Sequence, residues 1–334
     1  NRPGDYYGRI TRPVAYFLLA KLALNAEVYT DNDWTDGVRP DGGTISFTID
    51  GRQQNAWQAT VTYCDRITPM GFAREPLSET NFAVYNESSV ENIFTIPMNK
   101  TLYTNQMQYL FRSRHYNHAK AYGLSGENGS SATKDALRVF GYDTAEVDPR
   151  FDKCYFAGVM YNLKGELIRL DDGTVLEYHP WEVAVDISDM PYEKTAGARM
   201  KKYAIDTDAT KDGKLMENDI VLFRYADVLL MKSEAKVRNG ENGDAELAQV
   251  RSRVGAVARP ATLENLLDER LLEFAWEGWR RQDLVRFGRF TRAYSDRPQL
   301  AGEESGYTTV FPIPGNVLKM NERLRQNKGY LMSD

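Results

Sequence analysis

Residues 263–288 combine an apolar helical face with many charged side chains, and this restricts the fold more than any other feature. Apolar side chains recur at Leu263, Leu267, Leu271 and Phe274, which predicts one helix over residues 263–290, capped by Thr262. Opposite charges at short helical spacings predict ion pairs along its edge, at Glu269, Arg270, Glu273, Glu277, Arg280 and Asp283. We expect a structural helix in which Glu273, Glu277, Arg280 and Asp283 hold neighbouring hairpins in register and contact no ligand.

Helical patterns occupy both ends of the chain, whereas the middle is irregular. Apolar periodicity predicts further helices over residues 13–29, with Thr11 as cap, and over residues 56–67, 220–239 and 244–257. Between residues 103 and 181 tyrosine, asparagine and glycine accumulate, which predicts loops with short strands at residues 153–161 and 174–178. We therefore divide the chain into a helical-hairpin segment with a short strand (1–100), a loop-rich ligand-binding region (101–219) and a C-terminal helical region with a clamping tail (220–334).

Four motifs surround the charged helix in a fixed order: FRYADVLLMKSEA from Phe223, VRSRVG from Val250, FPIP from Phe311 and LRQNKGY from Leu324. Weaker motifs precede them, at Thr11 (TRP), Glu91 (ENIFTI) and Asp148 (DPRF). With these motifs the sequence strongly resembles the SusD/RagB family of Bacteroidetes. The resemblance implies a mainly α, SusD-like fold of tetratricopeptide-like helical hairpins with a loop-rich region containing short strands.

The same resemblance implies a function. Members of the SusD/RagB family are non-catalytic nutrient-uptake lipoproteins at the outer surface of the outer membrane. They capture glycans, or in some cases peptides, for a SusC-like TonB-dependent transporter. We expect this chain to do the same, with a peptide-binding relative or a helical-repeat scaffold for protein partners as the alternatives.

Two departures from the family pattern matter. Members are usually longer and begin with a signal peptide and a lipid-modified cysteine, so we expect this chain to be the C-terminal portion of a member, attached to the membrane through a lipidated N-terminus. Around residues 245–251 the spacing is compressed relative to the family, so we expect a locally altered hairpin.

Composition excludes several other classes. The chain carries 42 basic and 47 acidic residues, a net charge of −5 and no basic block, which excludes a nucleic-acid partner. No run approaches the roughly 18 apolar residues of a membrane-spanning helix. Cys64 and Cys154 permit one disulfide without requiring it, and the helical spacing of Cys64 with Trp57 and Val61 predicts a buried thiol.

The common catalytic signatures are missing. The sequence contains no Gly-x-Ser-x-Gly, no phosphate-binding Gly-x-x-x-x-Gly-Lys-Ser/Thr and no His-Glu-x-x-His. His115 and His118 have a spacing that would suit a metal, but His179 is distant in sequence, so we interpret them as surface or hydrogen-bonded histidines. We therefore expect no enzyme activity.

One acidic loop has the spacing of a calcium site. Counted from Asp208, oxygen-bearing and turn residues stand at positions of the 12-residue EF-hand calcium loop. However, position 12 is Asp and not the longer Glu, and Met216 at position 9 cannot act as a ligand. We expect a solvated turn, with calcium as the alternative, at Asp208, Thr210, Asp212, Lys214 and Asp219.

The expected glycan surface needs aromatic rings for the C–H faces of sugars and amide, guanidinium or carboxylate groups for their hydroxyls. The middle of the chain supplies this mixture. The candidate ligand-binding residues are Tyr103, Tyr109, Arg112, Tyr116, Asn117, Tyr161 and Trp181.

Overall fold

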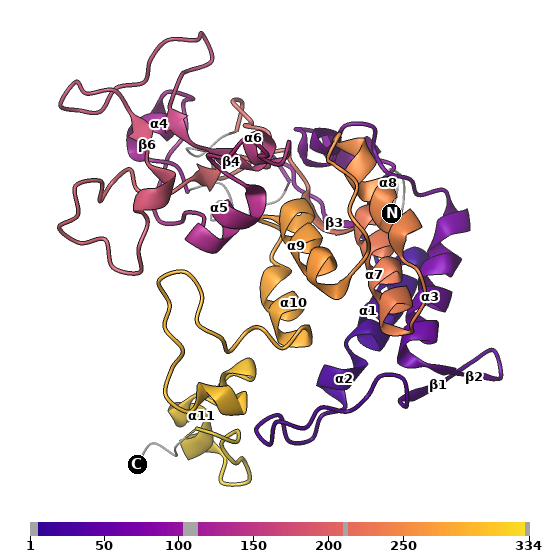
Figure 1. Ribbon diagram of the computed structural model, residues 1–334. Helices are drawn as coiled ribbons and strands as arrows, with labels where there is room; N and C mark the ends of the chain where they lie inside the picture. Colours follow the sequence, from indigo (N-terminus) through magenta and orange to yellow (C-terminus); the bar gives the residue numbers. More distant parts are fainter. Residues whose placement is uncertain (1–5, 103–112, 210–212, 331–334) are drawn as a thin grey trace.

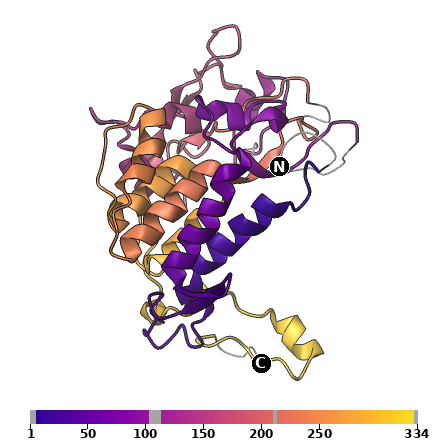
Figure 2. The same ribbon diagram turned by 90° about the vertical axis from the view of Figure 1, so that its right-hand side faces the viewer.

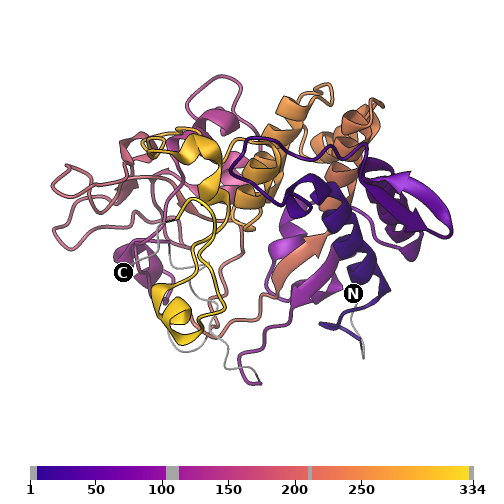
Figure 3. The same ribbon diagram turned by 90° about the horizontal axis from the view of Figure 1, so that it is seen from below.

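The structure is a computed structural model that describes residues 6–102, 113–209 and 213–330. The larger helices form one body, the loop-rich region lies beside it, and the C-terminal segment with α11 (Gly315–Met320) extends below (Figure 1). Seen from below, the C-terminal segment and the loop-rich region share one half of the molecule, and the β1–β2 hairpin lies at the opposite end (Figure 3). Among the described helices, none is long and apolar enough to cross a membrane.

The helical body is a row of packed helices. α1 packs on α3, α3 on α7, α7 on both α8 and α9, and α9 on α10. This arrangement confirms the expected helix-rich, hairpin-based fold. The helices are α1 (Arg12–Leu24), α2 (Ala26–Tyr29), α3 (Ala56–Ile67), α7 (Tyr225–Arg238), α8 (Asp244–Arg253), α9 (Leu263–Phe274) and α10 (Arg280–Arg286).

The strands are short and form antiparallel pairs. β1 (Ser46–Ile49) pairs with β2 (Arg52–Asn55), and β3 (Asn92–Ile96) with β8 (Ile220–Arg224). In the loop-rich region β4 (Tyr155–Phe156) pairs with β7 (Arg199–Met200), and β5 (Gly158–Val159) with β6 (Glu177–Tyr178). Three short helices accompany them, α4 (Tyr116–Lys120), α5 (Lys134–Phe140) and α6 (Phe151–Cys154).

Local signals identified some helix limits correctly. α3 spans the predicted residues because Asn55 and Gln58 form a reciprocal capping box at its start. The Thr262 side chain caps α9 by accepting a hydrogen bond from the Asn265 N–H, at 3.2 Å. Thr11 is the N-cap residue of α1, as expected, although its side chain forms no capping hydrogen bond. The predicted helix over residues 13–29 divides at Asn25 into α1 and α2.

Two predicted helices were wrong in part. The start of the predicted helix over residues 220–239 is strand β8, because its run of Ile, Val, Leu and Phe pairs with β3. The predicted helix over residues 263–290 breaks between α9 and α10. There Trp276 and Gly278 adopt left-handed φ angles of 67° and 84°, which a continuous right-handed helix excludes.

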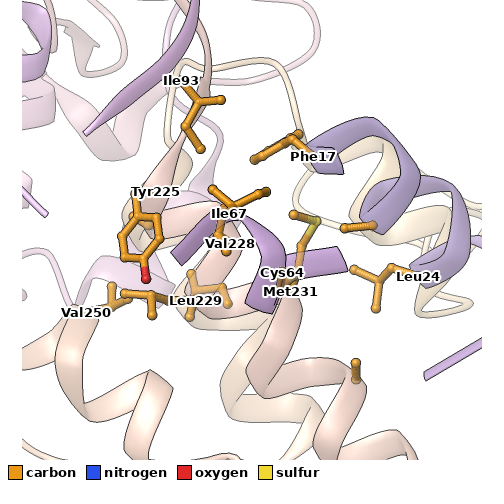
Figure 4. Close-up of a cluster of buried hydrophobic side chains, with 14 of the residues drawn as sticks. Phe17, Leu24, Cys64, Ile67, Ile93, Tyr225, Val228, Leu229, Met231 and Val250 are labelled. Carbon is orange, nitrogen blue, oxygen red and sulfur yellow. The ribbon is translucent and has the colours of Figure 1, made fainter. Parts of the chain in front are cut away.

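The main hydrophobic core joins distant parts of the chain. Phe17 and Leu24 of α1 and Ile67 of α3 pack with residues of α7 such as Val228 (Figure 4). Cys64 lies in this core as a free thiol, which confirms the predicted burial, and Cys154 is a second buried free thiol. Burial raises the pKa of both thiols.

The charges of α9 form the expected ion pairs, and they lie inside the protein. Glu269, Arg270 and Glu273 are almost fully buried. Their face is buried because α9 packs between α7, α10 and the loop-rich region, so charged groups must neutralise one another there.

One buried ion-pair network centres on Glu273. Its carboxylate accepts hydrogen bonds from Arg224 at 2.6 Å, from Arg150 at 3.0 Å and from Arg253. The network contains equal numbers of cations and carboxylates: Arg150, Arg224, Arg251, Arg253 and Lys202 with Asp148, Glu91, Glu269, Glu273 and Glu277.

A second buried network joins α1, α7, α9 and α10. Asp227 pairs with Arg270 at 2.6 Å and with Lys21 at 2.7 Å. Asp283 links Arg270 to Arg286, which also pairs with Glu234 at 2.8 Å. Glu273, Glu277 and Asp283 therefore find partners within the protein, as expected, and Arg280 donates to the Leu267 carbonyl at 2.7 Å.

The C-terminal tail contacts α10 and the loop of residues 31–39. Arg281 donates to the Thr309 carbonyl at 2.8 Å and lies over the Phe311 ring, while Lys328 pairs with Asp33. A cavity of about 1130 Å³ lies between loop 31–39, α5, α9, α10 and residues 288–309.

Candidate functional site

Side chains that bond to backbone groups help to hold the loop-rich region together. The Arg199 guanidinium is buried and donates to carbonyl oxygens of separate loops, among them Ser113 at 3.2 Å and Ala196 at 2.8 Å. These bonds satisfy backbone acceptors that regular secondary structure would otherwise satisfy. One buried cation thus joins separate loops of this region.

Helix α4 presents two of the predicted ligand residues. The His115 ring caps it by accepting a hydrogen bond from the Asn117 N–H, at 3.1 Å. Behind the helix, the Tyr178 hydroxyl accepts from the His115 N–H at 2.8 Å and lies 3.0 Å from Nδ1 of His118. Burial, followed by the nearby Arg114 charge, lowers the pKa of His118 to about 3. The imidazole is therefore neutral at physiological pH, and its contact with the Tyr178 hydroxyl helps to hold α4 in place.

Side-chain bonds join α4 to the hairpin of residues 158–178, at the upper left of Figure 1. The Asn117 amide donates to the Arg169 carbonyl at 3.0 Å and to the Asp171 carboxylate at 2.9 Å. The Tyr122 hydroxyl donates to the Tyr161 carbonyl at 3.0 Å. The two bonds from Asn117 use the hydrogens of its amide, and the amide oxygen remains as a hydrogen-bond acceptor.

Two of the predicted aromatic residues expose their rings on this α4–hairpin surface. Tyr116 is 57% exposed and Tyr161 is 51% exposed. Tyr116 neighbours Asn117 on α4, and the Tyr161 carbonyl accepts the bond from Tyr122, the second residue after α4. Arg169 and Asp171 belong to the same surface. Sequence inspection missed them because they carry no signal beyond being polar residues near a turn.

Trp181 stands in a different environment. Its indole packs against a second hydrophobic cluster and lies 6.0 Å from the ring of Tyr142. The half-buried ring therefore contributes to packing beside α5. Three other candidates, Tyr103, Tyr109 and Arg112, lie outside the described residues.

The loop considered for calcium is described at Asp208, Lys214 and Asp219, whereas Thr210 and Asp212 lie outside the described residues. The Asp219 carboxylate is buried, and it accepts hydrogen bonds from the Tyr7 hydroxyl and, at 2.7 Å, from the Met98 N–H. Burial, the largest influence, raises the pKa of Asp219. Among residues 6–102, 113–209 and 213–330, no group of three or more His, Cys, Asp or Glu side chains could hold a metal ion.

Comparison with known proteins gives a consistent family match. The sequence profile of the SusD family matches residues 90–330. The starch-binding protein SusD of Bacteroides thetaiotaomicron is 32% identical over 139 residues, which cover 40% of this chain and 25% of the relative.

Solved structures share the fold over nearly the whole chain. A surface glycan-binding protein A from Bacteroides thetaiotaomicron, in complex with laminarihexaose, is 18% identical with a TM-score of 0.65, over 98% of this chain and 66% of its own. A laminarin-binding SusD-like protein is 21% identical with a TM-score of 0.64, over 98% of this chain and 64% of its own. This chain therefore spans slightly less than two thirds of these structures.

Proposed function

Because the chain belongs to the SusD family, we propose that it captures an oligosaccharide or polysaccharide without changing it chemically. The observation that carries the proposal is the α4–hairpin surface, where the exposed rings of Tyr116 and Tyr161 accompany Asn117 and Asp171. Aromatic faces suit the C–H side of a sugar ring, and amide and carboxylate oxygens accept hydrogen bonds from its hydroxyls.

The relatives support a glycan as the ligand. One is named for binding starch, another for binding laminarin, and a third structure contains laminarihexaose. These ligands differ, so they support the class of ligand and leave the particular sugar to experiment.

The bonds that the polar groups already form within the protein support capture without catalysis. The Asn117 amide and the Asp171 carboxylate bond to each other, and the buried His118 bonds to Tyr178. These groups position the surface, whereas acid–base catalysis needs a titratable group in reach of the scissile bond.

The proposal extends to a partner and a location. We infer a lipoprotein at the outer surface of the outer membrane that delivers its ligand to a TonB-dependent transporter, with a permanent interface well above roughly 2,000 Å². The native protein should co-purify in mild detergent with a large outer-membrane barrel. Its recovery as a lone species would contradict this part of the proposal.

Calorimetry with laminarin, starch and a set of peptides tests the ligand class. We expect binding to at least one glycan, with dissociation constants from about micromolar to millimolar, because an open surface loses contact energy to ordering the ligand. Chromatography of the glycan after prolonged incubation should show unchanged chain lengths. Binding to peptides alone, or shortened glycan products, would overturn the proposal.

A further inference from the structure

An arginine-lined cavity lies beside α10, on residues other than those of the α4–hairpin surface. Its volume of about 1130 Å³ suits an extended organic ligand, since pockets for drug-sized molecules measure about 300–1,000 Å³. Part of its lining belongs to the C-terminal segment, which Figure 2 shows at the lower end of the molecule, with the loop-rich region at the upper end. Four arginines of the lining, the cavity arginines, are Arg39, Arg281, Arg289 and Arg292.

The cavity arginines differ from the buried arginines of the charge networks, which pair with carboxylates. Arg39 and Arg281 donate to backbone carbonyls, at 3.0 Å and 2.8 Å. Two other arginines of the lining, Arg238 and Arg286, share Glu234. Within the described part of the chain, none of the four cavity arginines forms an ion pair, so each of them can take an anionic partner from outside the protein.

The carboxylates of the lining do not balance the cavity arginines. Asp135 pairs with Arg138 at 2.7 Å, and the charge of Arg280 acts on Asp268. Three carboxylates of the lining then remain for the four cavity arginines: Asp31, Glu264 and Glu304. A hollow with an excess of positive charge attracts anions.

Aromatic rings accompany these charges. Trp34, Phe290 and Tyr294 line the cavity, and the Arg281 guanidinium lies 4.8 Å from the centre of the Phe290 ring. A guanidinium fork can bind two oxygens of one anionic group, and an aromatic ring can pack on the C–H face of a sugar.

We propose that this cavity binds an acidic oligosaccharide, with carboxylate or sulfate groups on the cavity arginines and sugar rings against the aromatic side chains. The requirement for an anion rests on the cavity alone, whereas the choice of a saccharide rests on the proposed function. The site is separate from the α4–hairpin surface.

Calorimetry of the purified protein with oligogalacturonate and with dextran sulfate tests the proposal. Oligogalacturonate has only carboxylates and dextran sulfate has only sulfates, so the two probes separate the anionic groups. We expect binding of at least one probe, weakened by added salt because salt screens the charges.

The double variant R289Q R292Q should weaken this binding about tenfold or more, because a hydrogen bond to a charged group contributes about that much. Both arginines are exposed, so the melting temperature should not change. The control R9Q R52Q removes the same charge from exposed residues outside the cavity and should keep the affinity of the wild type.

Three results would overturn the proposal. The first is a wild-type protein that binds neither probe, and the second is equal affinity of R289Q R292Q and the control. The third is binding of polyglutamate as tight as that of the acidic glycans and lost in R289Q R292Q, which would assign the cavity to an acidic polypeptide. Laminarin and starch separate this site from the capture site, because their binding should weaken in Y116A and stay unchanged in R289Q R292Q.

Discussion

Replacement of Glu273 by glutamine tests the structural role of the buried charge network. Burial alone would raise the pKa of Glu273, but Arg253, Arg224 and Arg150 together outweigh burial and lower the pKa well below its usual value. E273Q keeps the shape of the side chain and removes one negative charge, which leaves the surrounding guanidinium groups with one carboxylate too few.

We expect E273Q to lose about 3–5 kcal/mol of unfolding free energy, the cost of leaving a buried charge without its partner. This is a large share of the roughly 5–15 kcal/mol that stabilises a typical protein. Urea denaturation followed by circular dichroism gives the difference directly.

E264Q is the matched control, because Glu264 lies on the same helix and is exposed. Its cost should stay below about 1 kcal/mol, the range for one charge in the first turn of a helix. If E273Q matched E264Q in stability, the reasoning that the network is electrostatically essential would be wrong.

Three further predictions concern stability and reactivity. The pKa of Glu234 is lowered to about 2, because Arg286 and Arg238 outweigh the effect of burial. The stability that the ionised Glu234 gives the folded protein is therefore complete above the usual pKa of 4.5 and is lost as the pH falls towards 2. The difference in urea midpoint between wild type and E234Q should shrink from pH 6 to pH 3. Gly278 has a φ of 84° between α9 and α10, so G278A should destabilise the protein by about 1–2 kcal/mol in thermal unfolding, whereas G129A in a loop with negative φ should not. Cys64 and Cys154 are buried with raised pKa values, so Ellman's reagent should react with them only on unfolding, and fast reaction of the native protein would contradict the described core.

The sequence predicted the bounds of α3 correctly because the signals for this helix are local. The capping box of Asn55 and Gln58 and the periodicity of residues 56–67 specified α3 without help from distant residues. Strand β8 could not be identified in the same way. Its apolar residues fit a helix or a strand equally, and pairing with β3, distant in sequence, decides between them.

The buried networks show a second limit of sequence inspection. Glu91, Arg150, Arg224 and Arg253 belong to separate sequence motifs, yet all of them contact Glu273 or its direct partners. Helical spacing reveals only neighbours on one helix, so it predicted ion pairs along the edge of α9 but not their partners on other elements.

The candidate surface was predictable in composition but not in connectivity. The sequence identified Tyr116, Asn117 and Tyr161 as suitable residue types in an irregular region. That Asn117 bonds to Asp171, and that Tyr122 fixes the Tyr161 backbone, depends on loop conformations that no local pattern specifies.

The affinity of Y116A for a bound glycan tests the central claim most directly. Y29A is the control, because Tyr29 has a similar exposure of 56% but lies on α2, in the helical body. Calorimetry should show that Y116A weakens glycan binding by about 1–2 kcal/mol at unchanged melting temperature, since exposed aromatic residues are frequent binding hot spots. Glycan binding by Y116A and by Y161A at the affinity of Y29A and the wild type would contradict the α4–hairpin surface as the capture site.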